Sequence, residues 1–555
     1  MSLIKANAVQ VGQSPTATQN FTLAVPSSPD GTIKLARGNS GATTQDVMNV
    51  SNAGVVSFPQ GLGNISNSTA ISTGSTTARS LANRFADVVN VKDFGAVGDG
   101  VADDTAAIQA AINAATGKQL VLPSGTYKIS GTLNLLNSIY IVGYGQCTLQ
   151  QSQANTTSIR IGDGTLANRF GDVSIENITF TTTSSAAWTS AYVIDVQFAY
   201  FIEFKNLDIF GYVSSVKKMW GGIRLFKAMR FKAERCFMRG LIGDCVYTLG
   251  ETGGINYCID LTFENCYFDD FQNNGFYFDD FTLGTFLYNC VMASSVGNSL
   301  ITYDISSSEK SNHYVYGLNA ECHSTMNGII INSASQVQIQ NGWIQVGSTK
   351  NAVYIGQNAG GIQIQGFWTT EGRWLIEGKN ISITDGYIGS LLPDSSYAVT
   401  IDGTSGKADV VDIRNTTIDQ FTGGGINLLN QPTRMSINGV RFYSVSQPYI
   451  NGSGYAGGPI IEGVASNLQA NGSQFVTAAN TITFGFGREF WQITGATIIE
   501  NITAQNPGRK LYLQAGTGGV TFTNTGNIRL NSNSLSAFDV IELICDGQNW
   551  FEIGR

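Results

Sequence analysis

A repeat that runs from about residue 170 to 445 is the strongest constraint on the fold of this chain. Each repeat unit is a short alternating strand, then Asn or another small or polar residue, then a second short strand. The asparagines recur at intervals of about 23 to 30 residues, or at multiples of that interval: Asn177, Asn206, Asn265, Asn289, Asn341, Asn415 and Asn438. Repeat periods of roughly 20 to 50 residues are typical of solenoids.

One strand-rich repeat of this length forms one coil of a parallel β-helix, in which apolar side chains fill the interior. Asn suits the turns, because it tolerates left-handed backbone and can hydrogen-bond to the Asn stacked on it. Leucine-rich repeats have a similar period, but the L-x-x-L-x-L spacing is missing, and propeller blades need a longer period. The sequence therefore predicts an all-β chain built on a parallel β-helix.

At 555 residues the chain exceeds what one hydrophobic core usually spans, so we expect several parts. Residues 1–80 are polar, with short strands and a Ser/Thr-rich linker, and predict a small N-terminal β-domain. Residues 81–130 are expected to form a neck and the start of the β-helix, and 131–455 the β-helix itself. Residues 456–555, where strands follow one another at closer spacing, predict a C-terminal antiparallel sandwich that serves trimerisation or glycan binding.

Composition excludes several classes of protein. The net charge is -8 and no basic cluster is interleaved with aromatics, which argues against a nucleic-acid surface. No apolar run is long enough to cross a bilayer. The N-terminus lacks the apolar core of a secretory signal, so we expect folding in a cytoplasm. Buried reduced thiols are expected rather than disulfides, and four cysteines recur with the repeat: Cys236, Cys266, Cys290 and Cys322.

The stretch VKDFGAVGDGVADDTAAIQAAINAA, residues 91–115, is dense in glycine and aspartate. NVKDF predicts a strand, GAVGDG a turn, and 104–115 a helix for which Asp103 or Asp104 is the N-cap. A further strand is expected at QLVLPSGTYKI. The helix has one apolar face at i, i+3, i+4 and i+7, made by Ile108, Ala111, Ile112 and Ala115.

The same stretch fits no metal or phosphate site. An EF-hand loop that starts at Asp99 would need a carboxylate at its last position, where Ala110 stands. A P-loop lacks its Gly-Lys-Ser/Thr, and the glycines run GxxGxG rather than GxGxxG. We therefore expect a structural unit, with no cofactor and no metal.

DFGAVGDGVADDTAAIQAAINAA, followed by LVLPSGTYKI, closely resembles the opening motif of the pectate-lyase-like right-handed β-helix superfamily over about 45 residues. The order of the segments resembles that of bacteriophage tailspikes, and AFDVIELICDGQNWFEIGR is similar to the closing segment of several phage tail proteins. The resemblance implies a plug helix over the first coil, which would protect an exposed sheet edge.

The resemblance also implies the function. A tailspike of this kind is a homotrimer located on the virion tail, attached to the phage tail or baseplate through its N-terminal domain. It binds and usually cleaves the capsule or O-antigen of the host bacterium. Aromatic residues at many non-interior positions agree with a trimer, because a monomer would expose large apolar patches.

Hydrolysis of a polysaccharide normally uses two carboxylates. When the repeats are aligned on their Asn position, Asp269, Glu321 and Glu371 fall near one longitudinal stripe, with one coil between successive members. Neighbouring coils lie about 4.8 Å apart, so carboxylates one coil apart suit a retaining reaction, and two coils apart approach the upper end of the inverting range. We predict Glu321 with Glu371 as the acid/base pair.

A second acidic cluster lies in FDDFQNNGFYFDDF, residues 268–281. Its four carboxylates are expected to raise one another's pKa, to bind calcium, or to face solvent on a turn. From this cluster Asp270 and Asp280 are the second choice for catalysis.

Six further side chains are expected to bind substrate: Tyr303, His323, Trp343, Trp368, Arg373 and Trp374. Aromatic rings stack on sugars, and an Arg can hold an acidic sugar. Trp343, Trp368 and Trp374 could instead pack in the interior or at a trimer interface.

Two alternatives to a hydrolase remain open. A lyase would act on a uronic-acid-containing glycan, with His323, Arg373 or Tyr303 as possible participants. A non-enzymatic spike would bind its receptor without cutting it. An esterase is disfavoured, because there is no G-x-S-x-G elbow and only His313 and His323 could serve a triad.

Overall fold

The computed structural model describes most of the chain between residues 69 and 445 and separate strands on either side of it. The described ranges are 8–11, 21–24, 33–39, 42–50, 56–57, 69–165, 170–251, 257–294, 296–306, 311–322, 325–429, 434–445, 460–462, 465–466, 475–477, 481–482, 490–494, 498–503, 507–515, 518–537 and 539–554. The chain divides into two compact units, Met1–Val88 and Val89–Arg555.

The first unit contains an antiparallel five-stranded sheet. Its strands lie side by side in chain order: β1 (Ala8–Val11), β2 (Phe21–Ala24), β3 (Ile33–Asn39), β4 (Ala42–Val50) and β5 (Val56–Ser57). A hairpin of β6 (Thr69–Ile71) and β7 (Ala78–Ser80) leads into the short helix α1 (Leu81–Phe85), which Ser80 caps.

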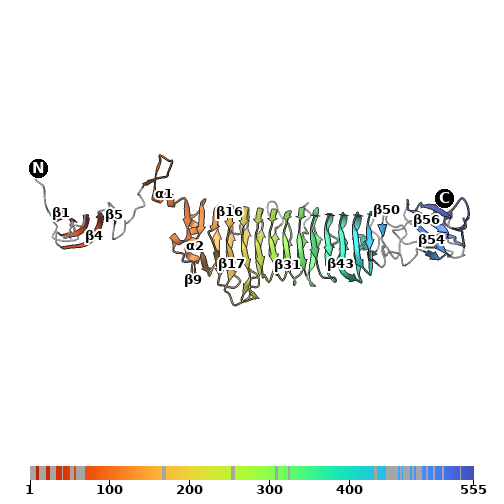
Figure 1. The fold of residues 1–555 in the computed structure, drawn as a ribbon, viewed down its shortest axis with the longest axis horizontal. Coiled ribbons are helices and arrows are strands. Elements are labelled where there is room, and N and C mark those ends of the chain that lie inside the picture. The colour runs from red at the N-terminus through yellow and green to blue at the C-terminus, as the bar shows by residue number, and fades with distance from the viewer. Residues whose placement is uncertain are drawn as a thin grey trace. The chain divides into compact units, whose positions relative to one another are not determined.

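The second unit is built on three long sheets of parallel strands, and the predicted parallel β-solenoid is confirmed (Figure 1). The first sheet has 15 strands, from β8 (Val88–Asn90) to β50 (Ile460–Glu462). The second also has 15, from β9 (Asp99–Asp103) to β51 (Ala465–Ser466). The third has 12, from β12 (Leu133–Leu135) to β47 (Gly424–Leu429). Each coil from β10 (Gln119–Leu122) to β47 contributes one strand to each sheet, whereas the coils of β8, β48 (Met435–Asn438) and β50 have no described strand in the third sheet.

Alternation along each strand places one row of side chains inside the solenoid and the next row outside. In the third sheet the inner row is in register through ten coils: Ile194, Ile223, Val246, Phe276, Ile301, Ile329, Val353, Trp374, Val399 and Ile426. All of these side chains are buried. Since a buried side chain of this size contributes about 1.5–3 kcal/mol, the stacked interior holds the coils together.

The predicted Asn turns lie between the first and second sheets. Six of the seven asparagines have a positive φ near 50°: Asn177, Asn206, Asn265, Asn289, Asn341 and Asn415. Asn206 Nδ2 donates to Asn177 Oδ1 at 2.8 Å, so the expected bond between stacked asparagines is present. Asn438 departs from the prediction, because Gly439 takes the left-handed position in its coil, with φ 64°.

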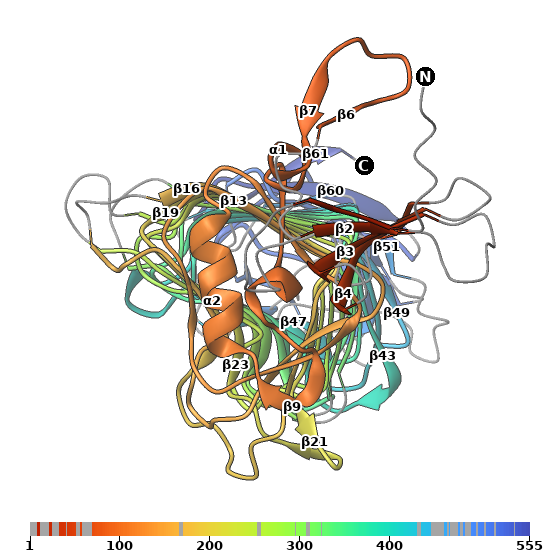
Figure 2. The same cartoon turned by 90° about the vertical axis from the view of Figure 1, so that its left-hand side faces the viewer.

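The helix α2 (Thr105–Ala114) closes the N-terminal end of the solenoid (Figure 2). Its predicted apolar face is confirmed, because Ile108, Ala111, Ile112 and Ala115 are buried in the same core as the first coils. Asp103 Oδ1 accepts the first-turn amide of Thr105 at 3.0 Å and so provides the expected cap.

The residues around this helix differ in part from the expected elements. NVKDF is a strand only up to Asn90, and Val91–Phe94 form a 3₁₀ turn. Asp104 makes no cap bond and instead accepts the backbone N–H groups of Val97 and Gly98, which fastens the glycine turn against the helix. QLVLPSGTYKI forms two strands, β10 (Gln119–Leu122) and β11 (Gly125–Ile129), because the chain turns a corner between sheets at Pro123.

Residues beyond 475 form a sheet with a separate apolar core. The sheet is mixed rather than antiparallel as predicted. β54 (Phe490–Thr494) pairs in parallel with β52 (Phe475–Thr477) and β56 (Lys510–Ala515), whereas β60 (Val540–Cys545) pairs antiparallel with β56 and β61 (Trp550–Gly554).

All eight cysteines are buried and free, as predicted. Cys236, Cys266 and Cys290 follow the left-handed turn residue in three successive coils, but Cys322 lies elsewhere, at the end of a second-sheet strand. Within the described residues, no helix is long and apolar enough to span a membrane.

Candidate functional site

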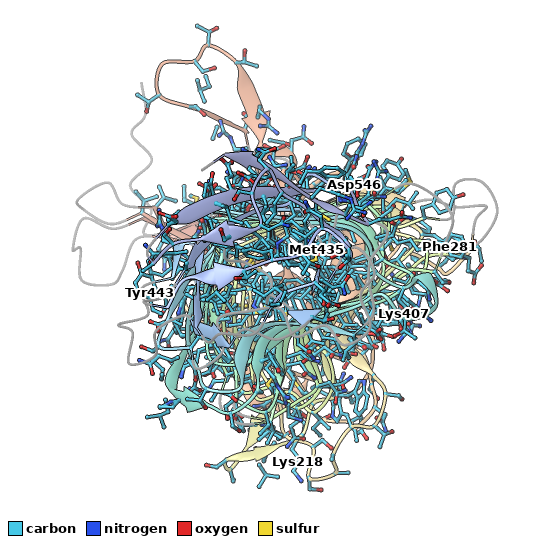
Figure 3. All side chains as sticks on the ribbon, turned by 90° about the vertical axis from the view of Figure 1, so that its right-hand side faces the viewer. Lys218, Phe281, Lys407, Met435, Tyr443 and Asp546 are labelled. Carbon is cyan, nitrogen blue, oxygen red and sulfur yellow. The ribbon has the colours of Figure 1, made fainter. Side chains whose placement is uncertain are left out.

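The outward face of the third sheet carries a groove of about 680 Å³. Figure 3 shows the corners that bound this face: Lys218 precedes the third sheet, and Lys407 follows it on the way to the first sheet. Its strands include β18 (Tyr192–Gln197), β26 (Val246–Leu249), β29 (Asn274–Phe278), β32 (Ser299–Asp304), β35 (Asn327–Ser333) and β38 (Asn351–Ile355). Four tyrosines, five asparagines and two aspartates line most of the groove: Tyr192, Tyr247, Tyr277, Tyr354, Asn273, Asn274, Asn298, Asn327, Asn332, Asp244 and Asp304.

Stacked tyrosine rings, which we call the tyrosine column, cover one end of the groove. Tyr247 and Tyr277 are register partners on neighbouring coils, with ring centroids 5.6 Å apart and planes 17° from parallel. Tyr192 stacks on Tyr247 from two coils away, at 6.0 Å. Its ring lies over Gly221, where a Cβ atom would overlap the ring, so this glycine makes the long stack possible. Because the rings cover one another's faces, the column offers a sugar its ring edges, its hydroxyl groups and the face of its end ring.

Carboxylates fix the hydroxyl groups of these tyrosines. Tyr247 Oη donates to Asp279 Oδ2 at 2.7 Å, and Tyr277 Oη donates to Asp304 Oδ2 at 3.2 Å. Burial, followed by interactions with these aspartates, raises the pKa of both tyrosines above its usual range. Both phenols are therefore protonated at neutral pH, and the hydrogen bonds hold the rings in place.

Asp304 lines the groove, and Asp279 lies beside it on the preceding coil. Phe278 and Tyr303 are register partners, so the next residues, Asp279 and Asp304, lie side by side on consecutive coils. The spacing of their backbones is about one strand separation, ~4.8 Å. Carboxyl groups that keep the spacing of their backbones would match the separation of about 5–5.5 Å in a retaining glycosidase.

Asp244 lies on the opposite margin and is almost fully buried. Its Oδ1 accepts Asn273 Nδ2 at 2.7 Å, Asn274 Nδ2 at 2.7 Å and the Asn274 backbone N–H at 3.1 Å, and its Oδ2 accepts Tyr192 Oη at 3.2 Å. Burial raises the pKa of Asp244, although these hydrogen bonds oppose the shift. Asp244 precedes the tyrosine row by three residues and Asp304 follows it by two, which separates them by about 16 Å along the strands. Asp244 therefore cannot share one glycosidic bond with Asp304, and it organises the groove margin instead.

The predicted stripe of Asp269, Glu321 and Glu371 lies on the second sheet, outside the groove. Asp269, Ala293 and Glu321 are register partners on β28 (Tyr267–Asp269), β31 (Val291–Ser294) and β34 (Asn319–Cys322), so the first two carboxylates are in line and two coils apart. Glu371 departs from the row, because Thr370 of β40 (Trp368–Thr370) holds that position. Glu371 follows in the turn, with φ 100°.

The three tryptophans that were predicted to bind substrate lie in different places. Trp343 of β37 (Trp343–Gln345) and Trp368 are register partners on the outward face of the second sheet, where Trp368 is 55% exposed. Trp374, like Tyr303, is buried in the solenoid interior and cannot contact a polysaccharide, so the sequence prediction is wrong for both residues. Both lie on inward rows of the third sheet.

The remaining candidates are dispersed. Arg373, at the start of β41 (Arg373–Ile376), is half-buried and donates to the Thr349 carbonyl at 2.7 Å. His323 lies outside the described residues. His313 is fully buried, and burial lowers the pKa of His313 to about 3, so it is not available to a catalytic triad.

The acidic segment 268–281 is not a cluster in space, because β29 separates its two pairs of aspartates. Asp270 is bonded to Tyr212 and Lys217 of the hairpin β21 (Tyr212–Val213) and β22 (Val216–Lys217). Asp280 accepts the backbone N–H and the hydroxyl of Ser306. The pKa of Asp270 is raised by burial, and not by the repulsion between carboxylates that the sequence suggested.

Residues 88–300 match a family model described as rhamnogalacturonase A/epimerase, pectate lyase-like. Mannuronan C5-epimerase AlgE5 of Azotobacter vinelandii is 54% identical over 66 residues, a match that covers 10% of this chain and 7% of that relative. Alginate lyase 7 of the same organism is 53% identical over 66 residues, covering 10% of this chain and 8% of the relative. This chain thus spans only a small part of the curated relatives that it matches.

Two solved structures are among those similar to this chain. The A-module of mannuronan C-5 epimerase AlgE6 from Azotobacter vinelandii has a TM-score of 0.46 at 16% identity, covering 69% of this chain and 100% of that one. Bacteriophage CBA120 tailspike protein 3 has a TM-score of 0.41 at 11% identity, covering 88% of this chain and 72% of that one. The segment 88–300 that matches the pectate-lyase-like family model includes the opening motif and the coils of the tyrosine column, and it lies within the parallel β-solenoid.

Proposed function

We propose that this protein binds and depolymerises a bacterial surface polysaccharide, capsule or O-antigen, in the third-sheet groove. The observation that carries the proposal is the tyrosine column beside the paired carboxylates Asp279 and Asp304. Stacked rings provide a platform for sugars, and two adjacent carboxylates provide an acid and a nucleophile. The sequence matches to polysaccharide-acting enzymes agree with this assignment.

The spacing of the pair favours hydrolysis with retention. One carboxyl group donates its proton to the glycosidic oxygen while the other carboxylate attacks the anomeric carbon and forms a covalent intermediate. Water then releases the sugar, and the first residue takes a proton from that water. The hydrogen bonds from Tyr247 and Tyr277 hold the two carboxylates in place.

Glu321 with Glu371 stays a second proposal for the acid/base pair, and substitution separates the two sites. The full chain is incubated with a panel of capsular and O-antigen polysaccharides, and the products are sized by gel permeation. Asp279→Asn and Asp304→Asn are each expected to lower the rate at least about 100-fold, since a general acid or base contributes roughly that factor or more. Glu321→Gln and Glu371→Gln are the matched controls on the second sheet and are expected to retain cleavage. The opposite pattern would place the chemistry on the second sheet.

A lyase is the second candidate, because the groove contains tyrosine hydroxyls close to carboxylates and alginate lyase 7 is among the sequence relatives. Elimination would leave an unsaturated sugar that absorbs in the ultraviolet, whereas hydrolysis would leave only new reducing ends. Measuring both on the same digest distinguishes the two reactions. Binding without any shortening of the polymer would instead support a receptor-binding spike.

We further propose that the protein acts as a homotrimeric phage tailspike on the virion tail, attached to the tail or baseplate by its N-terminal domain. Apolar side chains exposed on the second sheet support the trimer. Trp368 is 55% exposed, and Leu391 and Leu392 of β43 (Tyr387–Asp394) are 60% and 73% exposed. Exposed apolar side chains of this size are typical of a protein–protein contact.

A further inference from the structure

The row of the third sheet that carries the tyrosine column continues, toward the N-terminal coils, as a row of charges. Tyr247 is the register partner of Arg224 on β23 (Gly221–Phe226), Arg224 of Asp195 on β18, and Asp195 of Arg160 on β15 (Ile159–Ile161). Neighbouring strands lie about 4.8 Å apart, so Arg224 lies one strand from the Tyr247 ring. A polymer that stacks on the tyrosine column and continues along the solenoid axis passes over both arginines.

This charged row contains one more positive than negative group. Arg224 donates from Nε and Nη2 to the two oxygens of Asp195, each at 2.7 Å. Arg160 Nε lies 3.5 Å from Asp195 Oδ2, and Gln197 Nε2 donates to the same oxygen at 2.6 Å. Asp195 is therefore saturated and its side chain is only 3% exposed, whereas the side chains of Arg160 and Arg224 are 40% and 35% exposed.

Asp195 alone offsets this charge among the described carboxylates that are ion-paired with the two arginines. Within the described part of the chain, Asp195 is the one partner with which Arg160 and Arg224 form ion pairs. The nearest members of the same row are Asn134 on one side and Tyr247 on the other, and neither carries a charge at neutral pH. A guanidinium group that is partly exposed, with its one carboxylate shared, retains N–H donors for a second anion.

We propose that Arg160 and Arg224 form an anionic subsite at the end of the tyrosine column, which binds the carboxylate of an acidic sugar residue. The inference rests on the proposed function and adds a substrate class to it, an acidic surface polysaccharide. The planar donor edge of Arg matches a carboxylate group, and hydrogen bonds between charged partners are about twice as strong as neutral ones. The tyrosine column then supplies stacking, and the arginines select for charge.

Arg160→Gln is the test variant, because it removes the surplus charge and leaves the two Arg224–Asp195 hydrogen bonds in place. Arg239→Gln is the matched control. Arg239 also pairs with an aspartate, Asp269 at 3.0 Å, but on the second sheet. Both variants and the unmodified chain are applied to an array of acidic and neutral bacterial surface polysaccharides. Each acidic polymer is also presented in a form whose carboxyl groups have been reduced to alcohols.

We expect the bound glycans to be acidic, and reduction of their carboxyl groups to weaken binding by about tenfold or more, the factor that corresponds to ~1.4 kcal/mol. Arg160→Gln should weaken binding to the acidic form by a similar factor and leave the reduced form unaffected, while Arg239→Gln changes neither. Thermal unfolding of each variant shows whether it is folded.

Equal binding of acidic and reduced polymers, or an Arg160→Gln variant that binds the acidic form normally, overturns the inference. Cleavage of a neutral polysaccharide would overturn it and leave the proposed function standing. Absence of binding to every polymer would overturn both.

Discussion

At the scale of single residues, the turn between the first and second sheets is the most uniform feature of the molecule. Two residues separate the strands there in every coil from Asn177 to Gly439, and the first of them has a positive φ. Asn holds this position in most coils, but glycine replaces it at Gly317, Gly366 and Gly439. Left-handed backbone strains an ordinary side chain, so the residue type at this position is determined by conformation.

Gly317→Ala is expected to lower the thermal midpoint of the solenoid. The φ of Gly317 is 68°, and a Cβ there would overlap Asn289 Oδ1, so the cost is strain plus a clash, on the order of 1–3 kcal/mol. Gly117→Ala is the control for strain alone, because its φ is also 68° but no atom lies within 4 Å of the added Cβ. Equal decreases in the thermal midpoint for the two substitutions would show that the contact with Asn289 adds nothing to the strain. Gly317→Asn, which restores the residue used in the neighbouring coils, should be tolerated better than Gly317→Ala.

Asp244→Asn is expected to stabilise the protein at neutral pH. Burial raises the pKa of Asp244, so its ionised form is disfavoured in the folded state. Protonated Asp244 therefore contributes its full stability below the pKa of the unfolded chain, about 3.9. This contribution is lost as the pH rises through the higher pKa of Asp244 in the folded protein. Thermal midpoints measured at pH 7 and near pH 3.5 should show a higher midpoint for the variant at pH 7 and a smaller difference at low pH. A lower midpoint for the variant at pH 7 would show that the charge is stabilising.

At the scale of elements, α2 is a cap rather than a site. Its buried face joins the solenoid core, and the glycine and aspartate residues before it form turns that seat the helix. The density of these residues in the sequence reflects backbone geometry. The proposed chemistry lies more than a hundred residues further on, in the coils around the groove.

Ile108→Ala is expected to destabilise the N-terminal coils by about 2–5 kcal/mol, because it leaves a cavity under a fully buried side chain. Limited proteolysis followed by mass spectrometry should find the first cuts near α2 in this variant. Asn113→Ala on the exposed side of the same helix is the control and should digest like the unmodified chain. An Ile108→Ala variant with first cuts elsewhere would contradict a capping role.

Sequence reasoning predicted the second sheet better than the third for a geometric reason. Aligning repeats on the Asn turn fixes the register of the second sheet, since the turn length is constant, and Asp269 and Glu321 accordingly fall in line. The turn from the second to the third sheet varies. It runs from Phe210 to Gly221 in one coil and from Asp269 to Asn274 in another. An alignment of the repeats on Asn therefore does not give the register of the third-sheet strands.

The groove residues were missed for this reason, although one signal was present. Tyr247 and Tyr277 are one repeat apart in the sequence. The strand of Tyr247 ends two residues later, and Asp279 follows Tyr277 by two residues. Their alignment on the third sheet needs the structure. Tyr303 and Trp374 were assigned to the surface because alternation within a strand cannot be phased until its register is known.

At the scale of the whole molecule, the solenoid exposes different chemistry on different sheets. The third sheet carries the groove, and the second carries the apolar side chains Trp368, Leu391 and Leu392. In a trimeric spike, the third sheet would then bind the polysaccharide and the second sheet would contact the other subunits.

Leu392→Asp is expected to weaken the proposed trimer, because it places a charge in the apolar patch. Sedimentation equilibrium should give three times the chain mass of 59.3 kDa for the unmodified protein and a lower mass for the variant. Val101→Asp is the control, since Val101 is 75% exposed but lies near the N-terminal cap. A monomeric unmodified protein, or a Leu392→Asp variant that remains trimeric, would contradict this assignment.

The most direct test of the central claim is the structure of the Asp304→Asn variant with an oligosaccharide of a polymer that the protein binds. We expect sugar rings in contact with Tyr247 and Tyr277, with the scissile bond beside residues 279 and 304 of the third sheet. Sugar found instead along Trp343 and Trp368 on the second sheet, with the third-sheet groove empty, would contradict it.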